Sequence, residues 1–112
     1  MHPTDFQREM LRTLSPTNRD LTQATLGLMD EVGELAKVVK NNRAQGHPLN
    51  MQNVAEELGD ILYYTAMACH VCELSMSEVM DNVIAKLRRR YPEGFSADKS
   101  INRDVEAEMR GL

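Results

Sequence analysis

The chain has 112 residues and a formal net charge of −4. This length predicts one domain over residues 1–112, and the negative charge argues against nucleic-acid binding through bulk charge. No segment has the roughly 20 apolar residues of a membrane helix, and residues 1–5 do not resemble a secretory signal. Two cysteines are too few for a disulfide framework. We therefore expect a cytoplasmic protein with neither membrane nor nucleic-acid partners.

The spacing of apolar residues predicts helices throughout, and no window alternates as a strand would. A short helix is expected over residues 4–13. Ser15-Pro16 has the form of an N-cap followed by proline at the first helical position, and the apolar stripe that follows runs to about Arg43. The polar residues 41–48 include Gly and Pro and are expected to form a connection.

Two further helices are predicted after this connection. Asn50 or Asn53 is placed to cap the first of them. A capping box, Ser75-x-x-Glu78, opens the second, which ends before Pro92. The remaining residues, 96–112, form a charged and weakly periodic tail. The predicted fold class is therefore all-α, an antiparallel helix bundle.

A hexapeptide pattern of acid, acid, aliphatic, glycine, acid, aliphatic occurs twice, at residues 30–35 and 56–61. On a helix, side chains three residues apart project within roughly 60° of each other. Each copy therefore places two carboxylates on one side of its helix, beside the apolar stripe. The pairs are Glu31 with Glu34, and Glu57 with Asp60.

The two acidic pairs are expected at matching heights. Glu34 and Asp60 are equally far in sequence from His47, and a short connection favours antiparallel neighbours. Gly33 and Gly59 occupy equivalent positions in the two motifs, where glycine costs about 1 kcal/mol relative to alanine in a helix. This cost indicates a reason for glycine at both positions, such as a close approach of the helices.

Acidic residues on a helix commonly belong to a solvated face, and that interpretation stays open for these four. If they converge in a partly buried site, however, they repel one another unless cations neutralise them. Oxygen ligands without Cys or His suit a hard cation, Mg²⁺ or Mn²⁺, and such hydrated sites usually serve phosphate-bearing substrates. We therefore predict a site for Mg²⁺ or Mn²⁺ with four ligands: Glu31, Glu34, Glu57 and Asp60.

The last predicted helix carries a basic flank. Asn82, Lys86 and Arg89 share one side of it, and Arg90 adjoins them. Their amide, ammonium and guanidinium groups suit phosphate oxygens. The alternative is a solvated basic helix end, which the helix macrodipole favours. Secondary candidates for phosphate binding lie on the earlier acidic helix: Lys37 and Lys40.

Other site chemistries fit less well. Cys69-x-x-Cys72 falls late in its helix, whereas reactive thiols are usually found at helix N-termini. Zinc would need two further ligands, and the chain has three histidines. Core packing is therefore expected for these cysteines. A di-iron bundle would need Glu-x-x-His motifs, and there is no glycine-rich phosphate loop.

Taken together, the motifs resemble those of the MazG-like nucleotide pyrophosphohydrolases, in the all-α NTP pyrophosphatase superfamily. Three segments are similar to the sequences usual in that family: DEVGEL at residues 30–35, EELGDILYY at residues 56–64 and RYPEGF at residues 90–95. The spacing Lys86-x-x-x-Arg90 belongs to the same pattern. The resemblance covers residues 17–95.

This resemblance implies a bundle completed by oligomerisation into a homodimer or homotetramer. It also implies hydrolysis of a nucleoside triphosphate between its α and β phosphates, giving the monophosphate and pyrophosphate. The four matched acids would hold Mg²⁺, which polarises the phosphates and activates a water for in-line attack. Asp30, where glutamate is usual, would act with Glu31 in catalysis by positioning or deprotonating the water. Asn82 stands four residues before Lys86, where three is usual.

Two alternatives remain from the sequence. One is phosphoribosyl-ATP pyrophosphohydrolase, a relative with similar acidic helices. The other is a non-enzymatic helical module whose apolar stripes pair with a partner protein. No distinctive polar motif marks a preference for a base or a sugar.

Overall fold

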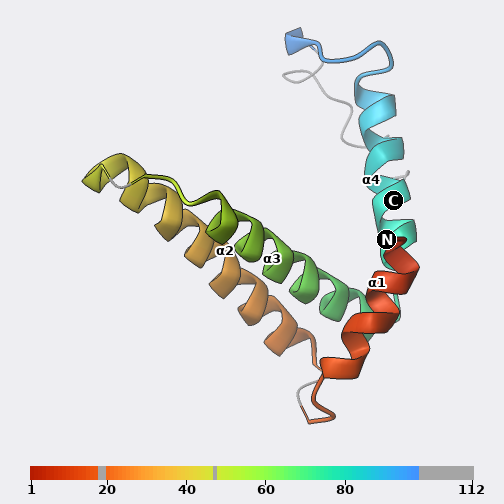
Figure 1. Cartoon of the computed structure of the whole chain (residues 1–112). Coiled ribbons are helices and arrows are strands. Elements are labelled where there is room, and N and C mark those ends of the chain that lie inside the picture. Colours follow the sequence, from red (N-terminus) through yellow and green to blue (C-terminus); the bar gives the residue numbers. More distant parts are fainter. Residues whose placement is uncertain (18–19, 47, 99–112) are drawn as a thin grey trace. The chain divides into compact units, whose positions relative to one another are not determined.

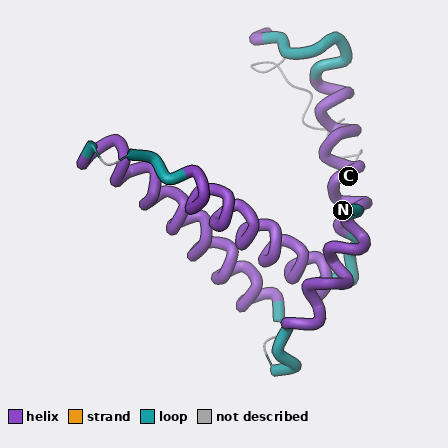
Figure 2. The backbone as a smooth tube through the Cα atoms, viewed as in Figure 1, coloured by secondary structure: helices purple, strands orange, loops and turns teal. Residues whose placement is uncertain are grey.

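The computed structural model describes residues 1–17, 20–46 and 48–98, and its regular elements are helices (Figures 1 and 2). They are α1 (Pro3–Met10), the 3-10 turn η1 (Leu11–Thr13), α2 (Leu21–Gln45), α3 (Met51–Val71) and α4 (Met76–Arg90). Within the described residues the only β-type pairing is an isolated bridge between Pro92 and Gly94. The predicted all-α fold class is confirmed. Most of the predicted charged tail lies outside the described residues.

The chain divides into two compact units, residues 1–74 and residues 75–112, and each is described by itself. The first contains α1 to α3, and the second contains α4 and the segment after it. None of the helices in the described segments combines the length and apolar character needed to cross a membrane. The prediction of a single domain stays a prediction.

Helix α2 begins later than the sequence pattern predicts. Its N-cap is Asp20, whose Oδ1 accepts a hydrogen bond from the Gln23 backbone N–H at 2.7 Å. The predicted cap, Ser15, instead accepts a hydrogen bond from the backbone N–H of Thr17 and forms a local turn. A carboxylate at the cap also interacts favourably with the positive end of the helix dipole. The predicted start at Ser15-Pro16 is therefore wrong.

Helix α2 also ends later than predicted. Residues 41–45, expected in the connection, are helical, and the helix stops at Gly46, which adopts the left-handed conformation with φ 68°. The connection then runs back beside the end of α2 to the start of α3 (Figure 1). Asn50, one of the two predicted caps, accepts hydrogen bonds from Gln52 and Asn53.

The other helix starts agree with their sequence signals. In α1, Pro3 occupies the first turn and the 3-10 turn η1 extends the helix, so the predicted span of residues 4–13 is nearly reproduced. In α4, the Ser75 hydroxyl accepts a hydrogen bond from the backbone N–H of Glu78, as the capping box predicts.

The core of the first unit is built from small and flexible side chains. Helices α2 and α3 pack side by side and α1 packs on α3 (Figure 1). The Thr13 hydroxyl donates to the Met10 carbonyl and lies 3.2 Å from the Tyr63 hydroxyl, which ties η1 to α3. Cys69 is buried in this core as predicted, whereas Cys72 is exposed. The buried apolar residues of this unit are Met10, Leu14, Ala24, Ala66, Met67 and Cys69.

Much of the predicted apolar stripe remains exposed on the α2–α3 pair. Val32, Leu58 and Leu62 are 48%, 47% and 49% exposed. In the second unit, the stripe of α4 is exposed as well, including Val83 and Ile84. Half-exposed apolar residues along a helix stripe are typical of faces that pack against another protein surface.

Candidate functional site

The close approach between α2 and α3 occurs at Gly27. A Cβ atom there would overlap the ring of Tyr64, whereas Cβ atoms at Gly33 and Gly59 would meet nothing described within 4 Å. The predicted close approach at Gly33 and Gly59 is therefore wrong within this chain. The contact sets the relative height of the two helices, because the Tyr64 ring occupies the space that a side chain at position 27 would fill.

This contact brings three of the predicted acids together. Counting one helical turn on from Gly27 and one back from Tyr64 reaches Glu31 and Asp60. One carboxylate oxygen each from Glu31, Glu57 and Asp60 lies within 4.8 Å of the other two. These three residues are the acidic cluster.

Glu34 is not part of the acidic cluster. The sequence places it at the height of Asp60, but in the structure Glu31 occupies that height. The difference arises because the connection runs back beside the end of α2 before α3 begins at Met51, so equal distance along the sequence does not give equal height. Glu34 lies exposed about one turn further along α2.

The acidic cluster carries an unsatisfied polar atom. Oε2 of Glu57 is buried and has no hydrogen-bond partner among the described residues. When both glutamates are ionised, Glu31 and Glu57 have only acceptors to offer each other. A proton or a cation is therefore required to make their approach favourable.

The close approach of Glu31 to Glu57 also raises the pKa of Glu31. This pKa rises from 4.5 to about 7, chiefly because protonated Glu31 makes a hydrogen bond with Glu57, and further because of burial and the negative charge of Asp60. When no cation is bound, Glu31 therefore keeps its proton up to about pH 7, where it is lost. The donor set, three carboxylates with one orphaned oxygen, fits a divalent cation that prefers oxygen ligands.

Tyr64 is a site residue that motif reasoning does not select. Its ring covers Gly27, and its pKa is raised by burial first and by the charge of Glu31 next. It also makes an edge-to-face contact with Tyr63, at 5.3 Å between ring centroids. Its position four residues after Asp60, on the same side of α3, is the sequence signal that would find it.

Comparison with known proteins identifies the family of this chain. The family described as MazG nucleotide pyrophosphohydrolase domain matches residues 19–95, which include both acidic motifs and α4. The chain belongs to the MazG family. The Gene 37 protein of Mycobacterium phage L5 is 31% identical over 87 residues, which cover 74% of this chain and 76% of that protein. No solved structure matches the chain.

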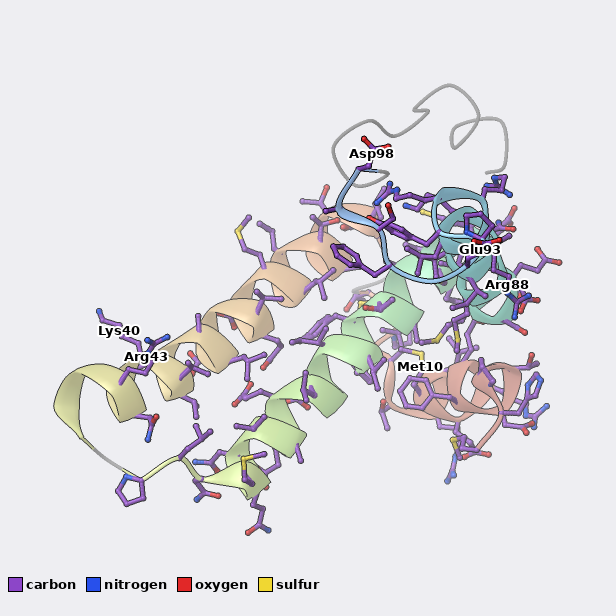
Figure 3. All side chains as sticks on the ribbon, turned by 90° about the horizontal axis from the view of Figure 1, so that it is seen from above. Met10, Lys40, Arg43, Arg88, Glu93 and Asp98 are labelled. Atoms are coloured by element: carbon purple, nitrogen blue, oxygen red, sulfur yellow. The ribbon has the colours of Figure 1, made fainter. Side chains whose placement is uncertain are left out.

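Within this MazG chain, the remaining predicted residues of the first unit lie on α2. Asp30 is exposed beside Glu31, and its negative charge contributes to the raised pKa of that residue. Lys37 is exposed, and Lys40 projects with Arg43 from the C-terminal part of α2 (Figure 3). The roles of these residues stay predictions.

The predicted phosphate-binding residues lie on α4, in the second unit. Asn82, Lys86 and Arg90 are half-buried and Arg89 is exposed. The Arg90 guanidinium lies over the ring of Tyr91, 5.8 Å from its centroid. The structure thus places these four residues on one MazG-family helix, and their approach to the acidic cluster stays a prediction.

Proposed function

We propose that this chain is a Mg²⁺-dependent pyrophosphohydrolase that cleaves (deoxy)nucleoside triphosphates between the α and β phosphates. The products are the nucleoside monophosphate and pyrophosphate. The observation that carries the proposal is the acidic cluster of Glu31, Glu57 and Asp60. One buried oxygen of Glu57 has no hydrogen-bond partner among the described residues. Membership in the MazG family supports the same reaction class.

In this proposal Glu31, Glu57 and Asp60 hold Mg²⁺, and Glu34 joins them on the adjacent turn of α2. Bound Mg²⁺ supplies positive charge that neutralises and polarises the phosphates. Mn²⁺ is an acceptable substitute because it also prefers oxygen ligands. Asp30, on the same turn as Glu31, orients the attacking water and accepts its proton.

The basic residues of α4 complete the proposed site. Lys86, Arg89 and Arg90 bind phosphate oxygens and Asn82 supports them through its amide. Lys37 on α2 is a further phosphate ligand. Charge complementarity favours this assignment, because a triphosphate must be neutralised by cationic side chains as well as by metal.

A homodimer or homotetramer is part of the proposal. The α2–α3 pair exposes Val32, Leu58 and Leu62, and a second copy of the chain would cover such a face. Association of this kind also completes a core that contains no large, fully buried side chain in the described residues.

Product identification tests the proposal directly. Purified protein with Mg²⁺ should convert at least one deoxynucleoside triphosphate to its monophosphate and pyrophosphate. ³¹P NMR identifies and quantifies these products. Release of orthophosphate and a diphosphate would contradict cleavage at the α–β bond. Faster turnover of phosphoribosyl-ATP than of every deoxynucleotide would identify the chain as a phosphoribosyl-ATP pyrophosphohydrolase instead.

A further inference from the structure

We propose that a cavity between α1 and α3 binds the nucleobase of the substrate and favours bases that carry an exocyclic amino group. The inference rests on the proposed function for the phosphate end of the ligand. The cavity is a groove open to solvent, with a volume of about 440 Å³. All the residues that line it belong to the first unit.

The walls of the cavity are mainly apolar and aromatic. Phe6 and Met10 come from α1, and Tyr63 comes from α3. Figure 3 marks Met10 on the short helix that packs against α3. The Tyr63 ring is held in place by its contact with Tyr64 and by the hydrogen bond between its hydroxyl and Thr13. Fixed aromatic rings are suitable surfaces for stacking a base.

The cavity and the acidic cluster share one residue. Asp60 contributes to both, and Gly59 beside it lines the cavity without a side chain to narrow it. A ligand whose phosphates are bound next to Asp60 therefore has an apolar, aromatic recess adjoining its phosphate end. A nucleoside triphosphate combines an anionic end with a flat aromatic end and fits this division.

We assign to Glu9 the role of distinguishing one base from another. Among the polar lining residues, the hydroxyls of Thr13 and Tyr63 already bond to each other, and Asp60 belongs to the acidic cluster. Among the described residues, the Glu9 carboxylate forms an ion pair with Arg12, at 3.1 Å on the exposed surface, and such a pair is weak. Glu9 lines the cavity, and a carboxylate in one such pair retains lone pairs that can accept further hydrogen bonds.

A carboxylate acceptor distinguishes bases by their hydrogen-bonding edges. Adenine, cytosine and guanine each present an amino group that donates to it. Thymine and uracil present one ring N–H flanked by two carbonyl oxygens, which a carboxylate repels. We therefore expect dATP, dCTP and dGTP to be preferred over dTTP and dUTP, by roughly tenfold or more in kcat/KM.

Matched variants test the role of Glu9. Glu9→Gln and Arg12→Gln both break the same surface ion pair, but only the first changes the cavity. Glu9→Gln should reduce the preference for amino-bearing bases to within about threefold of parity, and Arg12→Gln should leave it unchanged. An unchanged preference in Glu9→Gln, or an equal change in both variants, would overturn the proposal.

A second variant tests the aromatic wall. Phe6→Leu keeps an apolar side chain and should fold, but it removes a stacking surface. We expect it to raise KM for the deoxynucleotides roughly tenfold while leaving inhibition by inorganic tripolyphosphate, which has no base, unchanged. Equal KM values for Phe6→Leu and wild type would overturn the pocket assignment.

Binding without turnover separates this inference from the proposed function. In excess EDTA, 2′-deoxyadenosine should shift the NMR signals of the Tyr63 ring more than thymidine does at the same concentration, and Phe6→Leu should weaken the effect. If these nucleosides bind but no triphosphate is cleaved, the proposed function fails and the pocket stands. If triphosphates are cleaved but neither nucleoside perturbs Tyr63, the pocket is wrong.

Discussion

Gly27 of α2 lies against the ring of Tyr64 of α3, so closely that no side chain fits between them. One helical turn from this contact, Glu31 and Asp60 come into the same acidic cluster with Glu57. The helix contact and the candidate metal site are therefore parts of one arrangement, because the first sets the height at which the second forms.

Gly27→Ala should destabilise the chain. The new methyl group overlaps the Tyr64 ring, and relieving such overpacking typically costs about 1–3 kcal/mol. Gly33→Ala is the matched control on the same helix, where a Cβ meets nothing described within 4 Å. The control should gain up to about 1 kcal/mol from helix propensity. Urea unfolding measures both, and equal losses in the two variants would contradict a close approach specific to Gly27.

Glu57→Gln should abolish pyrophosphate release. The substitution removes a charged ligand from the acidic cluster, and we expect kcat/KM with Mg²⁺ to fall by roughly 100-fold or more. Glu56→Gln changes the neighbouring exposed acid, which is outside the cluster, and should retain activity within about threefold. A Glu57→Gln protein that cleaves as fast as wild type would remove this residue from the site.

The stability of the metal-free chain should fall as pH rises from about 5 to above 7. The pKa of Glu31 is raised from 4.5 to about 7 in the folded state, so between these values the folded chain binds a proton that the unfolded chain has released. The stabilising proton is lost as pH rises through about 7. Thermal unfolding in EDTA across this range measures the effect.

Two controls accompany the pH series. Glu31→Gln removes the titrating carboxylate and should flatten the dependence. Saturating Mg²⁺ should raise Tm most at high pH, since a cation replaces the proton as the neutralising charge. If the stability of the metal-free wild type is constant or increases from pH 5 to 8, Glu31 and Glu57 do not share a proton.

Leu62→Asp should weaken self-association. Leu62 is half exposed on the α2–α3 pair, and a buried charge there would oppose packing against a second copy. Leu49→Asp, in the connection before α3, introduces the same charge at another exposed leucine and should have no such effect. Light scattering coupled to size exclusion reports the masses, and a monomeric wild type would refute the proposed oligomer.

Local sequence signals determined the helices and the character of the acidic motifs. These signals depend on neighbours within one helical turn, so they can be predicted from the sequence. Examples are the caps Asn50 and Ser75 and the three-residue spacing of Glu57 and Asp60. A local pattern can also mislead: Ser15-Pro16 has the form of a helix start, but the N-cap of α2 is Asp20.

Only the tertiary structure decided which acids meet. The height of α2 against α3 depends on the path of the connection and on the fit of Tyr64 over Gly27. The second is a contact between residues distant in sequence. This register brings Glu31, in place of Glu34, to Asp60. The cavity beside Asp60 likewise exists because α1 packs on α3. Periodicity describes one helix at a time, and it carries no information about how far one helix slides along another.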